Sequence, residues 1–583
     1  MTRWPRRRRS GLLAAALATM LALTGFASAP ANSADVTGAT GSATAQETRP
    51  GLLDSPAPAA VHDWLGYDRP AQYESIDSEV KVPMRDGVRL ACYLYRPGHD
   101  GKVDSAEHPS LLIDFTPYQK YRANPANVYL AERGYNVLTC DVRGSGGSTG
   151  TFPSWFQPKE ATDNHDLIEW LARQPGATGD VGQVGQSYGS ITSYRAAALK
   201  PPHLRAIIPI VSPTNIYSEW VYPGGVQSTN GTWWANGGPV LSPADHTSTL
   251  RSFQQHPLYD GYWKQAVTTD KLRDVEVPAL HIGGYFDIFK NGGFDALEQR
   301  PRQTWLLNGP WIHGGFLQVP GLDPLYQGVD SANAISFSVV LQWFDHWLAK
   351  LPGAQLPPDR VISYASTSAK ASGSWHGYDR WPTAAASDTR LYPTADGALA
   401  DRAPARSGLS YQVNPIDGPS ADVIGTLPYE PSQNQATAEQ NSVLPNGRYT
   451  SSRTTFTLPA FTANTTLAGP VTLHLNASID AQDTYFVSKL ETVLPDGRVL
   501  PIETGYLRAQ LRDGLERAKP VTPGAATQYT VQLGQTHWQF KPGEKLRVTI
   551  GGGDSPRIVP TNPAGNVTVH LGGKTYVELP ALR

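Results

Sequence analysis

The chain has 583 residues, which is too long for one hydrophobic core, so we expect two or three domains. Hydrophobic residues make up 40% of it and charged residues only 17%, a composition that excludes an intrinsically disordered protein. The formal net charge of −2 argues against a nucleic-acid partner, because phosphate binding needs a concentrated positive surface.

The first 34 residues have the pattern of a secretory signal peptide. Arginines at positions 3 and 6–9 precede a short apolar run, Leu12 to Phe26, and small residues follow up to a cleavage site at or near Ala34. The run is too short to cross ~30 Å of membrane hydrocarbon. We therefore expect a secreted, extracellular protein with no membrane partner once the signal is removed. The paired arginines leave twin-arginine export and the general route both open. Loss of residues 1–34 removes five arginines and no acid, so the mature net charge is near −7.

Residues 35–60 are small, polar and proline-bearing, which predicts a flexible linker. The stretch "VKVPMRDGVRLACYLYRPG" then predicts two strands around an Asp-Gly turn, and "SLLIDFTPY" predicts a third. In "NVYLAERGYNVLTCDVRGSG" a helix is followed by another strand. Cys92 and Cys140 fall in these strands. They would form a disulfide if their strands are neighbours and would otherwise be two buried thiols, and the sequence leaves both open.

Strands and helices continue to alternate as far as residue 352. "NHDLIEWLARQP" predicts an amphipathic helix, and "VGQVGQSYGSITSYRAAALKPPHLRAIIPIVSP" predicts strand, turn, helix and strand. "VPALHIGGYFDIF" and "QTWLLNGPWIHGG" each predict one more strand. Such alternation is typical of a mostly parallel sheet, in a domain spanning about 61–352. Residues 213–275 lack strand patterns and are rich in Trp, Tyr and Gly, so we expect them to form a helical cap inserted into this domain.

After the predicted helix "SFSVVLQWFDHWLAKL" the helical periodicity largely disappears. Segments such as "GPVTLHLNASID", "KLRVTI" and "NVTVHL" alternate between apolar and polar residues and are separated by turns. Residues 353–583 are therefore expected to form an all-β sandwich of the jelly-roll type.

The pentapeptide "GQSYG" places Ser187 between two glycines. A G-x-S-x-G match alone is weak evidence, because an ordinary turn or helix cap explains it equally well. Here, however, the serine lies between a predicted strand and a predicted helix, as a nucleophile elbow requires. The amide of Tyr188 would then point at a developing oxyanion, aided by the helix N-terminus.

A serine becomes a nucleophile only when a base takes its proton, and that base needs an orienting acid. Asp287 and His313 each follow a later predicted strand, in the order Ser, Asp, His that α/β-hydrolases use. Taken singly, Asp287 could be a helix cap and His313 an ordinary loop histidine. Their joint occurrence in this order favours a catalytic triad with Ser187.

A second oxyanion donor is expected after an early strand, where many esterases carry a glycine-rich loop. This chain has "IDFTPYQKY" there, without such glycines. Tyr118 could supply its phenolic hydroxyl instead, or its ring could only pack against neighbours.

Six motifs in this order resemble the cocaine esterase and X-Pro dipeptidyl-peptidase family: "TPYQK", "DVRGSGGSTG", "GQSYGS", "GGYFDIF", "GPWIHG" and "WFDHWL". The C-terminal "GYLRAQLR" and "GEKLRVTIGGGDSPRI" are similar to the jelly-roll domain of that family. The resemblance implies an α/β-hydrolase with a cap and a C-terminal jelly roll. It also implies Ser187 as nucleophile, Asp287 as orienting acid, His313 as base, and Tyr118 with the Tyr188 amide as oxyanion donors.

The expected activity is hydrolysis of an acyl ester or amide of a small molecule or short peptide, through an acyl-enzyme, without a cofactor or metal. The cap tryptophans Trp220, Trp233 and Trp234 could line a substrate pocket or belong to a packed core. A dipeptidyl-peptidase must bind a free α-ammonium near a buried acid. Glu219 is a candidate for that acid, as are Asp245 and Asp260, although exposed surface positions explain all three.

Three functions therefore stay open at this stage. General acyl-ester or amide hydrolysis is favoured, because no well-defined acidic cluster is evident. Release of Xaa-Pro dipeptides is the alternative. A third possibility is a non-catalytic protein that binds carbohydrates or surfaces through its β-domain, because a fold does not fix a function.

Overall fold

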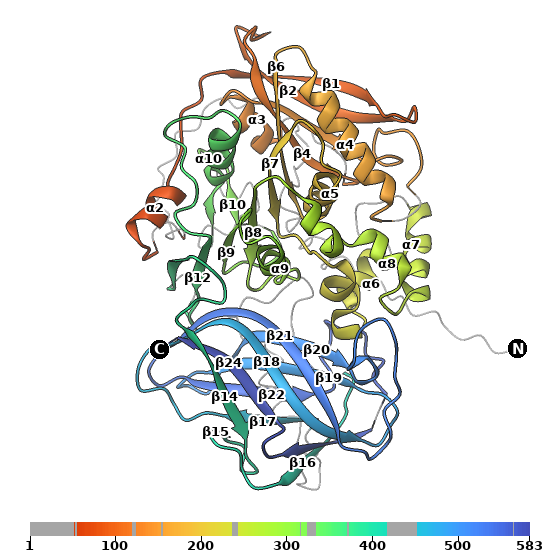
Figure 1. The fold of residues 1–583 in the computed structure, drawn as a ribbon, viewed down its shortest axis with the longest axis vertical. Helices are drawn as coiled ribbons and strands as arrows, with labels where there is room; N and C mark the ends of the chain where they lie inside the picture. The colour runs from red at the N-terminus through yellow and green to blue at the C-terminus, as the bar shows by residue number, and fades with distance from the viewer. Residues whose placement is uncertain are drawn as a thin grey trace, which may run out of the picture.

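The structure is a computed structural model (Figure 1). It describes residues 52, 55–118, 124–152, 155–235, 243–314, 316–322, 334–369, 372–416, 452–563 and 565–582, without the side chains of 233–235, 243–248 and 582. The predicted signal peptide (1–34) and most of the predicted linker lie outside these residues.

The N-terminal domain is built on one large sheet, which confirms the predicted mostly parallel α/β fold. Its strands β5, β4, β6, β7, β8, β9 and β12 run parallel, and antiparallel strands flank them at both edges. In spatial order the strands are β1 (Glu74–Pro83), β2 (Arg89–His99), β5 (Asn136–Asp141), β4 (His108–Thr116), β6 (Ala177–Gln186), β7 (Leu204–Ile210), β8 (Ala279–Gly284), β9 (Thr304–Gly309), β12 (Val361–Ala365) and β13 (Ser374–Tyr378), with β3 (Lys102–Val103) beside β2.

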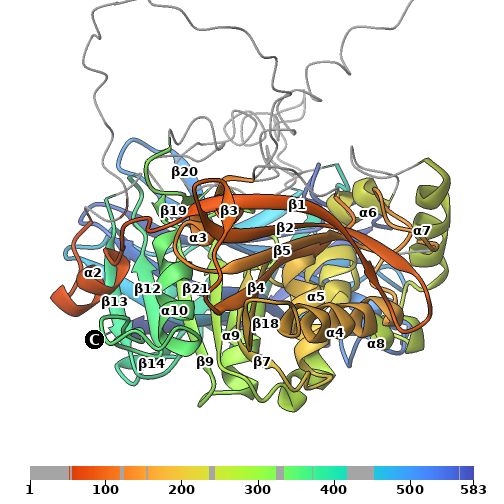
Figure 2. The ribbon, with the colours of Figure 1, turned by 90° about the horizontal axis from the view of Figure 1, so that it is seen from above.

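Helices cover both faces of this sheet (Figure 2). Successive side chains of a strand point to opposite faces, so in β4 Leu111 and Leu112 belong to two separate hydrophobic cores. The core of Leu112 also contains residues of α4 and α5, and the core of Leu111 contains residues of α2, α3 and α10. The helices are α2 (Ala59–Leu65), α3 (Pro125–Ala131), α4 (Pro158–Ala172), α5 (Tyr188–Ala197), α9 (Gly292–Gln299) and α10 (Ser338–Trp347).

The expected cap lies between β7 and β8, and the regular elements in its described part are short helices joined by loops. Its elements are η2 (Tyr217–Val221), η3 (Pro223–Gly225), α6 (Thr229–Ala235), α7 (Pro243–Gln255), α8 (Gly261–Ala266) and η4 (Thr269–Asp274). Two short strands, β10 (Leu317–Gln318) and β11 (Ile335–Ser336), pair after β9.

The C-terminal domain is all-β, as predicted. Its two antiparallel sheets share one core, to which Leu473 and Val531 come from one sheet and Leu490 and Val548 from the other. One sheet contains β15 (Leu399–Ala400), β14 (Ala386–Pro393), β24 (Tyr576–Leu582), β18 (Thr465–Ile479), β23 (Asn566–Leu571), β16 (Ser407–Gln412) and β21 (Thr527–Phe540). The other contains β17 (Arg453–Thr457), β22 (Lys545–Gly551), β19 (Tyr485–Val493) and β20 (Val499–Arg508), followed by η6 (Ala509–Leu511).

The predicted boundary between residues 352 and 353 falls before the end of the hydrolase sheet. Strand β12 pairs in parallel with β9, and β13 pairs with β12, so the sheet extends to Tyr378. Helical periodicity ends with α10, but the chain still returns to the sheet twice. A change of periodicity marks the last helix and not the last strand.

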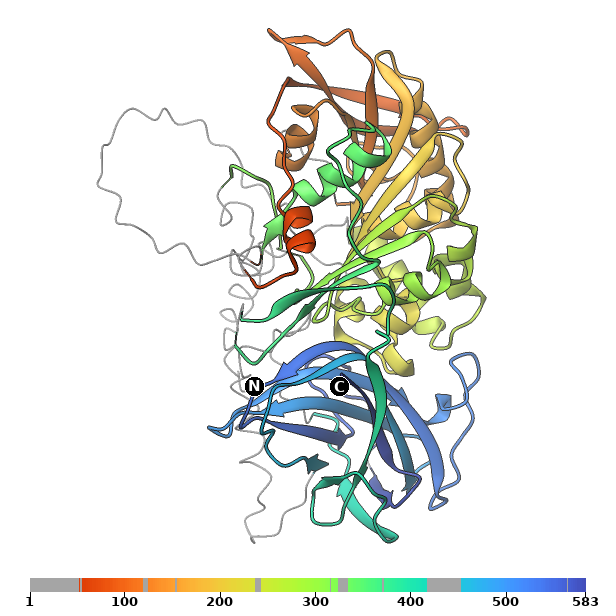
Figure 3. The same cartoon turned by 60° about the vertical axis from the view of Figure 1, so that its left-hand side comes forward.

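The two domains lie one above the other and touch closely (Figure 3). Just beyond β12, the Ser366 amide donates to the His537 carbonyl of β21 (2.9 Å), and the Gln539 amide donates to the Ser366 carbonyl (2.8 Å). The cap joins the β-domain as well, since the Thr229 amide donates to the Arg557 carbonyl (2.8 Å).

Cys92 and Cys140 form a disulfide, which settles the question left open above. Strands β2 and β5 are antiparallel neighbours, and the two cysteines face each other directly in that pairing. Both are fully buried. Within the described residues, no helix has the length and apolar character needed to cross a bilayer.

Candidate active site

Ser187 stands on a sharp turn between β6 and α5. Its φ of 55° and ψ of −114° are unusual for a residue with a side chain, as expected of a nucleophile elbow. The glycines on either side are required sterically. A Cβ on Gly185 would lie 2.3 Å from the Gly189 carbonyl carbon, and one on Gly189 would lie 2.6 Å from Oδ1 of Asp114. The Ser187 amide donates to the Ile210 carbonyl at 2.9 Å, which ties the turn to β7.

The structure brings the three predicted triad residues together at the carboxyl ends of their strands. Nε2 of His313 lies 2.9 Å from Oγ of Ser187, and Nδ1 lies 2.7 Å from Oδ2 of Asp287. The Asp287 side chain is completely buried, and its Oδ1 accepts the Phe289 amide at 2.5 Å. It does not cap α9, whose N-cap is Asn291. This geometry allows the imidazole to take the serine proton while the carboxylate holds Nδ1–H.

Two hydrogen-bond donors, the Tyr188 amide and the Tyr118 phenol, adjoin the Ser187 hydroxyl. Tyr188 is the first residue of α5, so its amide is among those without an acceptor inside the helix. The Tyr118 side chain hydrogen-bonds to Ser187, and burial raises the pKa of its phenol, which keeps the hydroxyl protonated as a donor. Its ring also packs edge-on against Tyr188, at 5.8 Å between centroids. The Tyr118 ring therefore packs and its hydroxyl contacts Ser187, while its donation to an oxyanion stays a prediction.

A buried polar network behind the nucleophile was not predicted. The Tyr188 hydroxyl donates to Glu160 at 2.8 Å, and Arg195 lies 3.9 Å from the same carboxylate. Burial raises the pKa of Glu160 to about 7, while Arg195 opposes the shift. These residues lie on α4 and α5, and no local motif marks them, because their partnership exists only once the helices pack.

Asp114 is a second unpredicted residue at the elbow. It has a φ of 46° near the end of β4, and its Oδ1 accepts the Gln186 amide at 3.0 Å. Burial raises its pKa to about 6. The carboxyl group therefore supports the residue directly before Ser187. The positive φ could not be read from the sequence, since aspartate in a strand shows no such signal.

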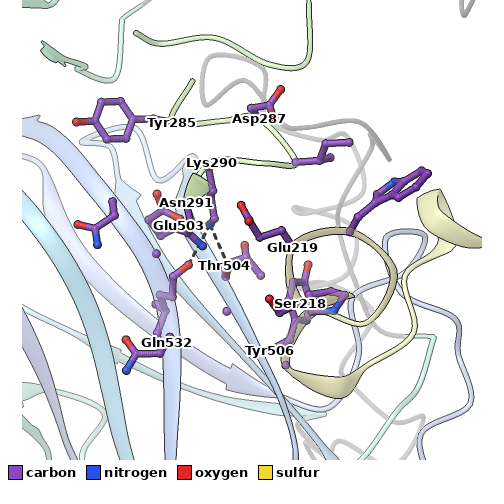
Figure 4. Close-up of a pocket in the computed structure, with 18 of the residues that line it drawn as sticks. Ser218, Glu219, Tyr285, Asp287, Lys290, Asn291, Glu503, Thr504, Tyr506 and Gln532 are labelled. Carbon is purple, nitrogen blue, oxygen red and sulfur yellow. Dashed lines mark hydrogen bonds and ion pairs between the residues drawn. The ribbon is translucent and has the colours of Figure 1, made fainter. Parts of the chain in front are cut away.

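Two cavities meet at Trp220 and Ile288. The smaller, of about 30 Å³, adjoins Ser187 and His313 and has a largely aromatic lining. Its lining residues are Tyr118, Trp155, Phe156, Ser187, Tyr188, Ile191, Trp220, Ile288, Phe289 and His313. The larger cavity, of about 610 Å³, lies between the cap, the β-domain and residues 285–291, which are called the Asp287 segment (Figure 4).

The predicted cap residues fall in different places. Trp220 is nearly buried and lines both cavities, whereas the side chains of Trp233 and Trp234 lie outside the described part. Glu219 lines the larger cavity: Oε1 accepts the Thr214 and Asn215 amides, and Oε2 has no hydrogen-bond partner among the described residues. Burial and the nearby Asp295 raise the pKa of Glu219 well above its usual value.

The other two acidic candidates do not join Glu219. Asp260 caps α8 by accepting the Tyr262 amide and contacts His256 at 2.6 Å. The Asp245 side chain is outside the described part. In the described ranges, no cluster of three or more His, Cys, Asp or Glu side chains is arranged to hold a metal ion.

Comparison with known proteins matches both domains to one family. The X-Pro dipeptidyl-peptidase (S15) family matches residues 86–238 and 234–315, and the X-Pro dipeptidyl-peptidase C-terminal non-catalytic domain matches residues 354–578. The cocaine esterase of Rhodococcus sp. is 25% identical over 561 residues, which cover 85% of this chain and 93% of the esterase.

Solved structures share the fold over nearly the whole chain. An aminopeptidase from a marine sediment archaeon of the Thaumarchaeota superposes with a TM-score of 0.70 at 20% identity, covering 89% of this chain and 98% of that one. An α-amino acid ester hydrolase gives 0.68 at 21% identity, covering 88% and 98%. The chain therefore belongs to the X-Pro dipeptidyl-peptidase (S15) and cocaine esterase family of serine hydrolases, with the C-terminal β-domain of that family.

Proposed function

We propose that this serine hydrolase is exported and cleaves carboxylic esters with small acyl groups, through an acyl-enzyme on Ser187. The observation that carries the proposal is the continuous hydrogen-bonded series Ser187–His313–Asp287 beside the Tyr118 hydroxyl. A series of this kind is what activation of a serine hydroxyl requires.

The proposed reaction has two acyl transfers. Oγ of Ser187 bonds to the acyl carbon while Nε2 of His313 takes the hydroxyl proton, and the carbonyl electron pair moves onto oxygen. The oxyanion accepts hydrogen bonds from Tyr118 and the Tyr188 amide. Collapse breaks the ester bond, and the alcohol leaves with the proton from His313. Water then attacks the acyl-enzyme in the same way, and the acid and free serine are regenerated.

The cavity beside Ser187 supports a small acyl group. Its volume is only about 30 Å³, against about 610 Å³ for the larger space, and Trp220 and Ile288 line both. A two-carbon acyl chain fits such a space better than an eight-carbon chain. We expect kcat/KM to fall from p-nitrophenyl acetate through the butyrate to the octanoate.

Release of Xaa-Pro dipeptides is the second candidate, and Glu219 favours it. A buried carboxyl oxygen that has no hydrogen-bond partner within the described ranges, on a cavity next to the triad, could accept a substrate ammonium group. The family description names this activity. The presence of Lys290 and Arg557 on the same cavity weakens the case, because both are cations.

Two experiments test these assignments. A fluorophosphonate probe should label the wild-type protein and not Ser187→Ala, whereas an unlabelled wild type would support the non-catalytic alternative. Wild-type enzyme that has not been exposed to the probe is then given p-nitrophenyl acetate and Ala-Pro p-nitroanilide in parallel. Fast ester turnover with an inert anilide supports the esterase. The reverse result, lost in Glu219→Gln, would establish the peptidase in its place.

Export is proposed from the N-terminal pattern. The buried disulfide supports it, because such bonds persist mainly outside the cytosol. Expression of the full gene should give mature protein in the medium with an N-terminus near Asp35. Intact protein retained in the cells would contradict export.

A further inference from the structure

Lys290 connects the segment of the triad acid to the β-domain. It lies three residues after Asp287, and its Nζ donates to the Leu533 carbonyl at 3.0 Å and to the Thr504 carbonyl at 3.2 Å. The third partner is the Glu503 carboxylate, which forms an ion pair with it. The ammonium group has three hydrogens, and the structure supplies three oxygens; Lys290, Glu503 and Thr504 are labelled in Figure 4.

The β-domain is shaped to receive this side chain. In the pairing of β18 with β21, Val471 faces Gly534 and Thr472 faces Gln532, so Leu533 is the extra residue of a β-bulge. The bulge removes the Leu533 carbonyl from the ladder with β18 and leaves it available to Lys290. Next to it, a Cβ on Gly534 would lie 3.0 Å from Cε and Nζ of Lys290 and 2.8 Å from Oε2 of Glu503.

The segment between Asp287 and Lys290 touches the catalytic base as well. The Phe289 amide holds Oδ1 of Asp287, and the Phe289 ring stands edge-on to the His313 ring, with 5.1 Å between centroids. A displacement of Lys290 would therefore act on both contacts at once. Lys290 itself makes none of the contacts within the triad.

We propose that Lys290 is a positioning residue. Its three partners in the β-domain, Glu503, Thr504 and Leu533, form a seat that holds Lys290 in place. This seat fixes Asp287 and, through Phe289, His313, and so makes the β-domain part of the catalytic unit. The proposal rests on the proposed role of Ser187, Asp287 and His313. Fixation is needed because misplacement of a reacting group by ~1 Å can cost about 100-fold in rate. Because a buried ion pair contributes little net stability, we test the Lys290–Glu503 pair for a geometric role.

The test compares Lys290→Met with Lys489→Met. Lys489 also forms a buried ion pair, with Asp554 at 2.6 Å, and both members of this pair belong to the β-domain. We expect Lys290→Met to lower kcat for p-nitrophenyl acetate by about 10- to 100-fold, with KM changed less than about threefold. The acidic limb of its kcat/KM profile should also move to lower pH, because the imidazolium loses a well-placed carboxylate. Lys489→Met should keep kcat and the limb of the wild type.

A second pair of variants perturbs the seat from the β-domain side. Gly534→Ala pushes against Lys290, whereas Gly572→Ala has a similar positive φ, 127° against 137°, and no neighbour closer than 3.6 Å. Only Gly534→Ala should reproduce the loss of kcat. Wild-type kcat and an unmoved limb in both Lys290→Met and Gly534→Ala would overturn the proposal, as would equal losses in the two controls.

A spectroscopic readout separates this proposal from the proposed function. The proton between Nδ1 of His313 and Asp287 should give a downfield NMR signal, which Lys290→Met should shift or broaden and Lys489→Met should not. A wild type that neither reacts with the fluorophosphonate probe nor hydrolyses p-nitrophenyl acetate would contradict the proposed function. The NMR signal would still report on the contacts of Lys290 in that case. An unchanged signal in folded Lys290→Met would defeat the positioning role alone.

Discussion

At the residue scale, two tyrosines next to the nucleophile offer different donors, one a hydroxyl and one an amide. Tyr118→Phe removes the hydroxyl that reaches Ser187, so kcat should fall about 10²- to 10³-fold. Tyr188→Phe removes a hydroxyl bound to Glu160 and leaves the amide in place. It should lower the melting temperature and keep kcat within about threefold. Steady-state kinetics of both variants check this, and equal losses of kcat would contradict the assignment.

Trp220 lines both cavities, so we expect its size to control acyl-chain length. Trp220→Ala should join the small space with the larger one and raise the octanoate-to-acetate ratio of kcat/KM at least about tenfold. Trp263→Ala is the matched control, because this tryptophan is fully buried in the cap and lines neither cavity. An unchanged ratio in Trp220→Ala would mean that other residues limit the acyl group.

The sequence predicted some site residues and missed others for a physical reason. Ser187, Asp287 and His313 each follow a strand, and parallel strands end at one edge of a sheet, so local patterns suffice to bring them together. Glu160 and Lys290 act through partners on other elements, and Glu503 lies 213 positions from Lys290. No local pattern encodes such a pair.

At the element scale, the disulfide between β2 and β5 should be a major source of stability. It closes a segment with a sequence separation of 48, for which the chain-entropy model gives about 4 kcal/mol, and measured values are typically 2–4 kcal/mol. The double variant Cys92→Ala/Cys140→Ala should lose about that much free energy of unfolding in urea titrations. Reductant should destabilise the wild type and leave the variant unchanged. A variant as stable as the wild type would contradict the prediction.

The strands and helices themselves were largely predictable, because apolar alternation and turn residues act over short distances. The paired strands around Asp86-Gly87 and the elbow with its flanking elements follow the expected pattern. The bulge at Leu533 was not foreseen, since a single extra residue leaves the alternation of the strand almost intact.

At the scale of the whole molecule, buried ionisable groups predict how stability depends on pH. Burial raises the pKa of Glu160 and Glu503 to about 7, so the folded state binds more protons than the unfolded state between about 4.5 and 7. Their contribution is fully present below about pH 4.5 and is lost progressively as pH rises from there through 7. Burial lowers the pKa of His281 to about 3 and that of His537 well below 6.5, so their contribution is lost as pH falls below 6.5.

Together these four groups predict a broad stability maximum between about pH 4.5 and 6.5, where the opposite slopes of the glutamates and the histidines cancel, and a decline above pH 6.5. From about pH 6.5 to 8 each of the two glutamates should cost on the order of 1 kcal/mol. Urea titrations at several pH values check the slope, and Glu160→Gln should flatten it on the alkaline side. A free energy of unfolding that rises from pH 6.5 to 8 would contradict the prediction.

The junction between the domains could not be foreseen, because it consists of contacts such as Ser366 with His537 and Thr229 with Arg557 that join distant parts of the chain. Only the order of the domains was readable from periodicity. The change of pattern near residue 352 concealed β12 and β13, which are short and follow a proline-rich turn.

The pairing of β12 with β9 also limits how this enzyme can be engineered. A shortened gene ending at residue 352 would expose the open flank of β9, and bare sheet edges invite self-association. Grafting the β-domain of a relative would keep that flank closed only if the crossover lay beyond Tyr378. Chimeras joined upstream should collect in inclusion bodies, whereas those joined downstream should stay in solution.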